Sequence, residues 1–315
     1  MTKKYIILNL NPGYDQYHVI RQNQPAVNVN RADEVYRAAS GKGLNIARAM
    51  HNLGSESYVC INVLGGCLGK LIMQLTRREG IICREFHIKE EARINTCIID
   101  EYKKETVSYN APGPQMSPVE TEQFLEFMKQ ILFGQEASVV LSGAPCRGIT
   151  EEGFRQLMGL VHEHHHRLIV DIAGKWLKMA VEYPVHILKV NREEFQDAFQ
   201  LDAFIFNNSL KRFKEAKGID VLIVTDGANG SVAYDNVGHR YQSFLNNLNG
   251  GICAVGSGDA FLGGFIKMEE DGANFKKCIS YANACGTANT FCYLPADIKN
   301  EEIETYEKYV VVKQI

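Results

Sequence analysis

Short runs of apolar and β-branched residues alternate along the chain with longer segments in which apolar residues recur at helical spacing. The runs predict buried strands at 5–10, 58–64, 138–143, 167–172, 186–190 and 221–227. The longer segments predict helices at 44–53, 118–133, 150–165, 192–200 and 256–270. Such alternation is typical of a mainly parallel sheet covered by helices on both faces. We therefore expect a three-layer α/β/α sandwich with its ligand at the carboxyl ends of the strands.

Two stretches interrupt this alternation. Residues 17–38 are polar and extended, and residues 93–109 read as two strands joined by a charged turn around Glu101 to Lys104. Both can project from the main sheet as a small β-sheet lid, to which we assign about 13–38 and 92–110. No internal repeat or low-complexity linker divides the chain, so we treat 1–315 as a single domain.

Composition and net charge limit which classes of protein and which binding partners are expected. With 315 residues, of which 45% are hydrophobic and 23% charged, the chain can bury one large core. A net charge of −3 provides no basic field that would recruit nucleic acid or an anionic membrane. No stretch approaches the roughly 20 apolar residues of a membrane span, and the first apolar run is too short for a secretion signal. We therefore expect no nucleic-acid or membrane partner.

The cysteines indicate the compartment. The chain has nine of them, an odd number, scattered from Cys60 to Cys292 without a C-x-x-C pair. They fit reduced, mostly buried thiols better than a disulfide framework or a zinc site. The expected location is the cytoplasm.

A glycine-rich stretch near the C-terminus, 253-CAVGSGDAFLGGF-265, carries the strongest chemical signal. Gly256 and Gly258 permit close backbone approach, and the apolar run after Asp259 can continue as a buried helix. The free amides and the positive dipole end of such a helix can hold a phosphate. A carboxylate at the same place suggests a base beside a phosphate. The alternative is that Asp259 is an ordinary N-cap.

Two other motifs are weaker. The stretch 162-HEHHH-166 contains the H-E-x-x-H spacing of zinc proteases, but it ends a helix that runs directly into a strand. Histidines at such a helix end are usually solvent-facing. The stretch 65-GGCLGK-70 lacks the spacer of a P-loop and the Ser or Thr after the lysine, so it is interpreted as a turn before a helix.

The chain resembles the phosphofructokinase B (pfkB) sugar kinases of the ribokinase-like superfamily. Both family signatures have counterparts in the right order, 30-NRADEVYRAASGKGLNIARAM-50 and 254-AVGSGDAFLGGF-265. The opening 8-LNLNPGYD-15 is similar to that of the 1-phosphofructokinase and tagatose-6-phosphate kinase branch. Further matches, which extend the resemblance over essentially the whole chain, are 93-RIN-95, 110-NAPGP-114, 141-LSG-143, 189-KVNREEF-195 and 224-VTDGANGSV-232. The resemblance implies a ribokinase-like fold and an ATP-dependent sugar kinase.

This resemblance assigns roles to individual residues. Asp259 is implied to be the general base, beside backbone amides of Gly256, Ser257 and Gly258 that stabilise the transferring phosphoryl group. The implied sugar-binding residues are Asp15, Gly41, Gly43 and Asn45. The candidates for the phosphate of the substrate are Lys42, Arg93 and Arg31, with Arg93 reaching in from the lid. Arg48 is interpreted as structural.

The nucleotide and metal sites are implied in the same way. The expected nucleotide-binding residues are Thr225, Gly227, Gly230, Gly251, Gly256, Gly258 and Asn283. Asn191 and Glu194, in N-x-x-E, are implied to organise Mg²⁺ through water, which suits an ion that keeps much of its hydration shell. The alternative for Glu194 is an ordinary acid in the first turn of a helix.

Four departures from the family pattern bear on the site. Ser40-Gly41 replaces the usual pair of glycines. Ser142 to Gly148 loses one hydroxyl at Ala144 and gains a cation at Arg147, and Asp171-Ile172-Ala173-Gly174 replaces Asp-Thr-Ser-Gly. Asp226 adds negative charge near the expected phosphates of the nucleotide, unless it points away or binds a cation.

The expected activity is phosphorylation of a ketose phosphate by ATP. Fructose 1-phosphate, which would give fructose 1,6-bisphosphate, is the first choice, and tagatose 6-phosphate or another phosphosugar is the alternative. A different class is a sugar-phosphate-binding regulator without efficient turnover. The presence of Asp259, Asn191 and Glu194 favours the enzyme, since sensing alone needs no base and no metal organiser. A homodimer through the lid is also expected.

Overall fold

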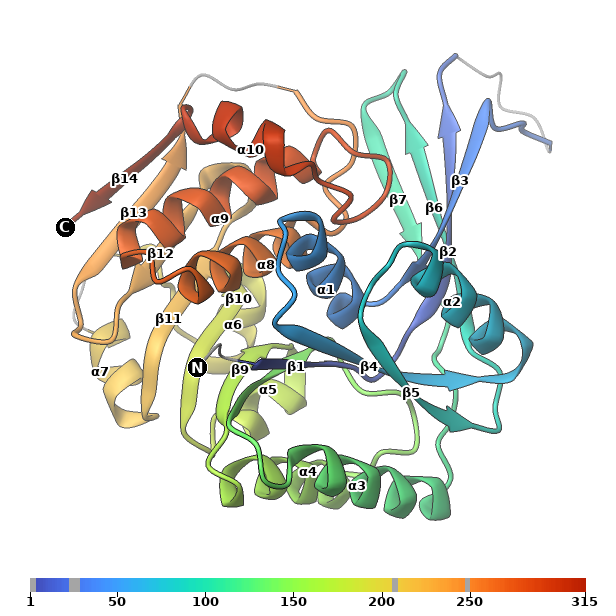
Figure 1. The fold of residues 1–315 in the computed structure, drawn as a ribbon. Coiled ribbons are helices and arrows are strands. Elements are labelled where there is room, and N and C mark those ends of the chain that lie inside the picture. The colour runs from blue at the N-terminus through green and yellow to red at the C-terminus, as the bar shows by residue number, and fades with distance from the viewer. Residues whose placement is uncertain (1–3, 23–28, 206–208, 247–249) are drawn as a thin grey trace.

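The computed structural model describes residues 4–22, 29–205, 209–246 and 250–315, and within them a large sheet forms the middle layer. Its strands are β1 (Lys4–Asn9), β4 (Tyr58–Gly65), β5 (Cys83–Ile88), β8 (Ala137–Ser142), β9 (Arg167–Asp171), β10 (Val185–Asn191), β11 (Ile219–Thr225), β12 (Ser231–Tyr234), β13 (Arg240–Leu245) and β14 (Val310–Gln314). They lie in the order β14-β13-β12-β11-β10-β9-β8-β1-β4-β5 (Figure 1). Neighbours pair in parallel from β11 to β5, and β12, β13 and β14 add an antiparallel edge.

Helices cover both faces of this sheet (Figure 1). One face carries α1 (Lys42–Asn52), α2 (Gly66–Arg78), α8 (Ser257–Glu270) and α9 (Phe275–Asn289), and α10 (Asn300–Glu307) packs on α9. The other face carries α3 (Pro118–Leu132), α4 (Glu151–Glu163), α5 (Gly174–Ala180), α6 (Arg192–Phe199) and α7 (Ser209–Ala216). The expected three-layer α/β/α sandwich is confirmed.

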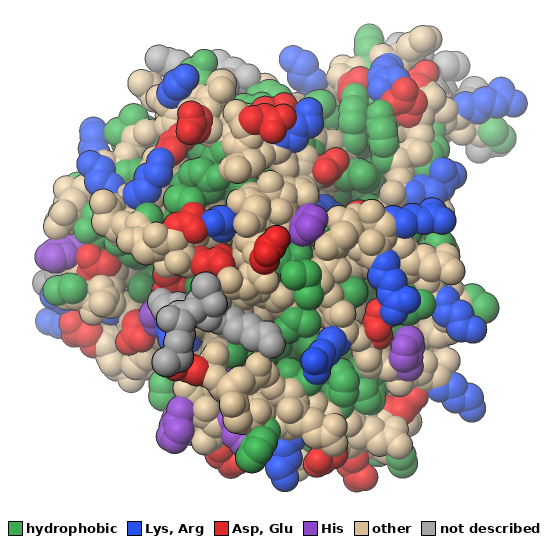
Figure 2. Space-filling model, in the orientation of Figure 1, with side chains coloured by type: hydrophobic (Ala, Val, Ile, Leu, Met, Phe, Trp, Pro, Cys, Tyr) green, Lys and Arg blue, Asp and Glu red, His purple; other side chains and the backbone are tan. Residues whose placement is uncertain are grey.

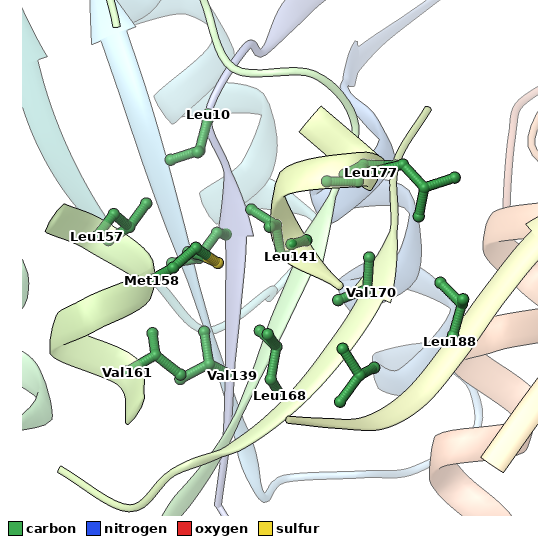
Figure 3. Packing of buried hydrophobic residues seen from close by; sticks show 14 of the residues in the cluster. Leu10, Val139, Leu141, Leu157, Met158, Val161, Leu168, Val170, Leu177 and Leu188 are labelled. Carbon is green, nitrogen blue, oxygen red and sulfur yellow. The ribbon is translucent and has the colours of Figure 1, made fainter. Parts of the chain in front are cut away.

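Alternate residues of the buried strands supply two separate cores. Ile6 and Leu8 of β1 point to the side of α3 and α4, whereas Tyr5 and Ile7 point to the side of α1 and α8. Figure 3 shows part of the first core, where side chains of α4 pack against β8 and β9. Each fully buried side chain of this size contributes about 1.5–3 kcal/mol relative to an exposed one, so the two cores fix how the helices lie on the sheet.

A smaller sheet stands at one side of the sandwich (Figure 1) and is called the lid below. Its strands are β2 (Gly13–Ile20), β3 (Glu34–Ser40), β6 (Arg93–Asp100) and β7 (Glu105–Tyr109), in the order β3-β2-β6-β7. The two strands and the charged turn expected within 93–109 are confirmed. Residues 23–28, part of the stretch expected to be extended, lie outside the described residues.

Contacts hold the lid against the main body. Tyr36 of β3 stacks on Tyr293 at a ring-centroid distance of 4.7 Å. The Tyr293 hydroxyl donates to Glu101 at 2.5 Å, and Arg21 pairs with Glu101 at 3.3 Å. These contacts join lid residues to the segment that follows α9. The lid therefore packs against the main body of the same chain.

The apolar pattern located most of the elements. All the strands and helices expected from it are present, with ends shifted by a few residues. Helix α2 begins at Gly66, which confirms the turn before a helix at 65–70. The pattern missed α9, whose residues are buried on nearly all sides, because a helix between two others shows no polar stripe. It also missed β5, the helices α5, α7 and α10, and the strands β12, β13 and β14 at the antiparallel edge.

The histidine run has a structural explanation. The ring nitrogens of His166 lie 3.1 and 3.3 Å from the carbonyl oxygens of Leu132 and Ala137. His166 is buried, so the expectation that these histidines face solvent is wrong at this position, where the loop fills the gap between α3 and β9. Among the described residues no group of three or more His, Cys, Asp or Glu side chains is placed to hold a metal ion.

Two further observations concern membrane-spanning helices and the state of the cysteines. No helix in the described parts of the chain is long and apolar enough to cross a membrane. All nine cysteines are free thiols, and six of them are buried.

Candidate active site

The site is built where the parallel strands end. Strand β9 ends at Asp171, β10 at Asn191 and β11 at Thr225, all at the carboxyl edge of the large sheet. Helices α1 and α8 begin at the same edge, so their free amides lie close to these polar side chains.

Asp259 lies in the first turn of α8 but does not cap it. The N-cap is Gly256, with φ 84° and no capping side chain. A Cβ atom at Gly256 would lie 2.4 Å from Cβ of Pro295, so only glycine fits there. Asp259 is 4% exposed, and its Oδ2 accepts a hydrogen bond from Nδ2 of Asn45 at 2.8 Å. The interpretation of Asp259 as a plain N-cap is therefore wrong.

The surroundings of Asp259 tune its basicity. Burial raises the pKa of its carboxyl to about 6, and the negative charge of Asp171 adds to this effect. Lys42, Asn45 and Lys189 act in the opposite direction. A carboxylate with a pKa near 6 is ionised at neutral pH and accepts protons better than an ordinary aspartate.

Two lysines share one buried carboxylate beside this base. Asp171 has a side chain with no exposed surface, and it accepts from Nζ of Lys42 at 3.0 Å and from Nζ of Lys189 at 3.2 Å. Burial opposes the charge on Asp171, but the two lysines hold its pKa below the ordinary range. The pKa of Lys42 is raised, because Asp171, Asp259 and Glu194 outweigh its burial.

The position of Lys189 explains why residue 258 is a glycine. A Cβ atom at Gly258 would lie 2.7 Å from Nζ of Lys189, which is 3% exposed. The missing side chain leaves room for the ammonium group. Two positive charges therefore lie next to Asp259 and the amides of α8, which suits a group that becomes more negative during reaction.

Helix α1 approaches the end of β1 closely. A Cβ at Gly41, whose φ is 127°, would lie 2.2 Å from Oδ1 of Asn9, and one at Gly43 would lie 2.5 Å from the carbonyl oxygen of Leu8. The close approach therefore falls on Gly41 and Gly43. Ser40 is buried at the end of β3, so the departure at this position leaves the approach intact.

Arg48 orients Asn45. Its guanidinium donates to Oδ1 of Asn45 at 3.0 Å, to the carbonyl oxygen of Ala39 at 2.6 Å and to Glu79. Because its donors are used in these bonds, Arg48 has the structural role expected for it. A chain of hydrogen bonds runs from Arg48 through Asn45 to Asp259.

The base of the lid presents a second polar group. Asp15 of β2 accepts from Nδ2 of Asn95 at 2.7 Å and from the hydroxyl of Tyr17 at 3.1 Å. These bonds fix the carboxylate in a position where one side chain can accept from two hydroxyl groups of a sugar. Asn95 stands opposite Asp15 in the register of β2 and β6, so the pairing of the strands creates this contact.

Arg93, at the start of β6, differs from Arg21 of the lid region in the partners of its guanidinium group. Its guanidinium donates to the carbonyl oxygens of Asn11 at 2.9 Å and Ala111 at 3.4 Å. No ion pair with a carboxylate is found for it in the described parts of the chain, and its Nε is buried without a partner there. Burial lowers its pKa, with Asp15 opposing. A half-buried guanidinium without a counter-ion suits an anionic ligand.

The structure does not bring Arg31 to this place. Arg31 is exposed and precedes β3, whose opposite end, Ser40, adjoins the site. At about 3.3 Å per residue, the length of β3 separates Arg31 from Gly41. Lys42 also differs from expectation, since Asp171 is its ion-pair partner.

A cavity of about 790 Å³ opens beside the start of α8. Its lining includes Thr225, Gly227, Gly230, Gly251, Ser257, Gly258 and Asn283, together with Lys104 and Thr106 of the lid. Gly256 is not in the lining, because Pro295 packs against it. A cavity of this size can hold a nucleotide. Six of the seven residues expected to bind one therefore meet in one space.

Asp226 has a cationic partner. Its Oδ2 accepts from Arg192 at 2.9 Å, and Arg192 also pairs with Asp202 at 2.6 Å. Of the two possibilities left open for Asp226, the structure shows the second: it binds a cation, which the same chain supplies.

Asn191 and Glu194 form a capping box at the start of α6. The backbone N–H of Glu194 donates to Oδ1 of Asn191 at 2.8 Å, and the backbone N–H of Asn191 donates to the carboxylate of Glu194 at 3.1 Å. The capping role is thus real. Glu194 still acts on the pKa of Lys42, so its charge lies near the site. This arrangement fits an Mg²⁺ ion that keeps its waters and binds mainly to nucleotide phosphates.

Several residues of the site carried little or no signal of their own in the sequence. In the sequence, Asp171 was noted only because the segment that it begins departs from the family pattern. Lys189 and Asn95 occur in segments that resemble the family, but neither was assigned a role. The position of Asp171 and Asn9 at the ends of parallel strands was the available signal. Lys104 and Thr106 line the cavity because the lid folds back on its own chain, which spacing alone does not predict.

Comparisons with known proteins agree with this architecture. Residues 12–301 match the model of the pfkB family carbohydrate kinases. A 1-phosphofructokinase of Borreliella burgdorferi is 25% identical over 286 residues, which cover 89% of this chain and 90% of that protein. The structure of phosphofructokinase-2 from Escherichia coli in complex with fructose-6-phosphate has a TM-score of 0.84 at 22% identity and covers 98% of this chain and 99% of that one.

A more distant structure has the same fold. Ribokinase of Arabidopsis thaliana, complexed with ribose and ATP, has a TM-score of 0.72 at 17% identity, covering 98% of this chain and 100% of that one. The sandwich and its lid therefore have the ribokinase-like fold, and the family match identifies a sugar kinase. The chain belongs to the pfkB family of carbohydrate kinases.

Proposed function

We propose that the protein transfers the γ-phosphoryl group of ATP to a hydroxyl group of a ketose phosphate, with fructose 1-phosphate as substrate and fructose 1,6-bisphosphate as product. The observation that carries the proposal is the buried Asp259, whose pKa is raised to about 6 and which lies close to Lys42 and Lys189. Its neighbour in the chain, Gly258, lines the cavity. The similarity to a 1-phosphofructokinase supports this sugar over tagatose 6-phosphate.

In the proposed reaction each residue of the site has one role. A sugar hydroxyl oxygen attacks the γ-phosphorus, the bond from that phosphorus to the bridging oxygen breaks, and ADP leaves. Asp259 takes the proton of the hydroxyl, while amides at the start of α8 and the ammonium groups of Lys42 and Lys189 stabilise the phosphoryl oxygens. Mg²⁺ bound to ATP would supply further charge neutralisation, with Asn191 and Glu194 organising its waters.

Substrate binding follows from the lid. Asp15, held by Asn95 and Tyr17, is proposed to accept from hydroxyl groups of the sugar. Arg93 is proposed to bind the phosphate already present on the substrate, because its guanidinium has no carboxylate partner among the described residues. Lys42, which is paired with Asp171, serves the transferring phosphoryl group.

The proposal is tested by Asp259→Asn. This change keeps the shape of the side chain but removes its ability to accept a proton, so kcat should fall by at least about 100-fold with the affinities for ATP and sugar nearly unchanged. Turnover is measured by coupled ADP release and affinities by calorimetry. Asp271→Asn, at the exposed end of α8, is the matched control and should keep wild-type kcat.

Two outcomes would contradict the proposal. Near-normal turnover of Asp259→Asn would remove this residue from the role of base. Binding of fructose 1-phosphate by wild-type protein without ADP release would instead identify a sugar-phosphate-binding regulator.

A dimer through the lid is part of the proposal. Strand β7 is exposed along its whole length and forms an edge of the lid sheet, so its backbone can pair with another strand. Ile94, Val107 and Tyr109 are 42%, 46% and 63% exposed there. Figure 2 shows hydrophobic side chains gathered over this part of the lid, between charged groups of both signs. A second copy of the chain would cover them.

A further inference from the structure

Two cysteines meet where the lid touches the main body. Cys97 lies on β6, and Cys253 lies in the loop that precedes Gly256 and helix α8. They belong to one buried cluster with Tyr17 and Ile99, and they are 5% and 4% exposed. The two thiols share a hydrogen bond.

The hydrogen bond makes the two thiols unequal. The bond from Cys97 lowers the pKa of Cys253 to about 7, against the effect of burial, and the backbone of Val255 and the hydroxyl of Thr106 act in the same direction as the bond. The pKa of Cys97 is raised by the same bond and by burial. Cys253 is therefore partly thiolate at neutral pH, and the thiolate is the reactive form of cysteine.

Cys253 is also within reach of small molecules. It lines the cavity of about 790 Å³, together with Thr106 of the lid and Ser257 of α8. Burial raises the pKa of Cys146 and of Cys278 to about 12 each, and neither lines this cavity. Cysteines that undergo reversible oxidation have a low pKa, can be reached by the oxidant and often lie next to a second cysteine. Cys253 has the lowered pKa, a place in the cavity lining and Cys97 as its neighbour.

We propose that Cys97 and Cys253 form a reversible disulfide when a small peroxide oxidises the protein, and that this bond fastens the lid to the loop before α8. The Cys253 thiolate attacks one oxygen of hydrogen peroxide, an S–O bond forms, the O–O bond breaks, and hydroxide leaves. The sulfur of Cys97 then attacks the sulfur of Cys253, the S–S bond forms, the S–O bond breaks, and water leaves with the Cys97 proton.

The consequence for turnover rests on the kinase function proposed above. A lid must open to admit sugar and release product, and a covalent bond from β6 to the loop prevents this. The bond also pulls on a loop that runs into Gly256, so the amides of α8 lose their alignment. The oxidised protein is therefore the inactive form, and a thiol reductant restores it.

A second cysteine pair provides a contrast. Cys60 and Cys83 are partners in the register of β4 and β5, but Cys60 has no exposed surface and neither residue lines the cavity. The pKa of Cys60 is raised well above its ordinary value by burial. Proximity is thus shared by both pairs, whereas only the pair of Cys97 and Cys253 contains a thiol, that of Cys253, with a lowered pKa and a place in the cavity lining.

The experiment treats the full-length protein with hydrogen peroxide and maps peptides without reduction. The expected result is a peptide pair joined through Cys97 and Cys253, together with a loss of at least about tenfold in kcat that dithiothreitol reverses. Cys97→Ser and Cys253→Ser should each keep the same kcat before and after peroxide. Cys67→Ser, which removes an exposed cysteine, and Cys83→Ser are the controls and should respond like wild type.

A nucleotide provides an independent test of the route. Saturating ADP should slow formation of the cross-linked peptide, because it covers Cys253 in the cavity. A different cysteine pairing, or a Cys253 that stops at the sulfenic acid, would overturn the inference even in an active kinase. A cross-link that forms in a protein without kinase activity would leave the disulfide standing and remove the proposed function instead.

Discussion

At the scale of single residues, we expect the ionisation of Asp259, the proposed base, to set the pH range in which the enzyme is active. The base must be ionised to accept a proton, and burial raises its pKa to about 6. We expect kcat to be full above this pH and to fall as the pH drops through about 6. Asn45 stabilises the ionised form through its bond of 2.8 Å, so Asn45→Ala should move the acid limb upward by about one pH unit.

The measurement is kcat against pH at saturating sugar and ATP. Asn52→Ala, at the other end of α1, is the matched control and should leave the limb in place. An acid limb that stays near pH 4 in wild type would show that Asp259 is not the titrating base.

We expect Arg93, the proposed ligand of the substrate's phosphate, to determine how strongly the enzyme prefers a phosphorylated sugar. With the guanidinium intact, fructose 1-phosphate should exceed free fructose by at least about 1000-fold in kcat/KM, which is roughly 4 kcal/mol and within the range of one or two charge-assisted contacts. Arg93→Ala should remove most of this difference, whereas exposed Arg84→Ala should leave it unchanged. Steady-state kinetics with both sugars provide the measurement, and tagatose 6-phosphate serves as the competing substrate. A preference for free fructose would exclude a phosphosugar.

The site shows what a sequence reveals about single residues. Asp259 could be predicted because its glycines are adjacent in the chain. The Lys42–Asp171–Lys189 group could not, because its members come from α1, β9 and β10 and meet only when the strands stand side by side. The same holds for Asp226, whose counter-ion Arg192 lies at the start of another helix.

At the scale of elements, the first turn of α6 forms a capping box and is proposed to organise Mg²⁺ as well. Its capping box uses an oxygen of Glu194, and glutamine is equally suited to that position. Glu194→Gln should therefore raise the Mg²⁺ concentration needed for half-maximal activity by at least about threefold while the melting temperature stays the same. Magnesium titrations and thermal unfolding provide the two measurements.

The neighbouring Glu193 provides a matched control for the change at Glu194. Glu193→Gln removes a negative charge from the same turn without touching the capping box, and it should leave the magnesium requirement unchanged. An unchanged requirement in Glu194→Gln would restrict this residue to its capping role.

The elements also show where apolar patterns fail as predictors. Strands buried on both faces, such as β1 and β8, are short continuous runs and could be located within a few residues. The edge strands β12, β13 and β14 and the buried helix α9 could not, because their burial depends on neighbours that are distant in the sequence. The lid strands β6 and β7 were found because residues 93–109 contain two strand-like runs separated by a charged turn.

At the scale of the whole molecule, the exposed β7 predicts the state of assembly. We expect wild-type protein to sediment as a dimer, and Val107→Asp to sediment as a monomer because a charge there cannot be buried at an interface. Analytical ultracentrifugation at micromolar concentration is the measurement. Val119→Asp, on the surface of α3, is the matched control and should remain dimeric. Monomeric wild-type protein would remove the lid from this role.

The order of strands in the large sheet has a consequence for how the chain is made on the ribosome. Strand β1 is synthesised first, yet it pairs with β4 on one side and with β8 on the other. Its apolar run YIIL, within KYIILN, leaves the exit tunnel long before Ala137–Ser142 are synthesised. During this interval one edge of β1 is unpaired and prone to associate with other nascent chains. Slow translation between β4 and β8 would therefore prolong the time in which a chaperone must guard the first strand.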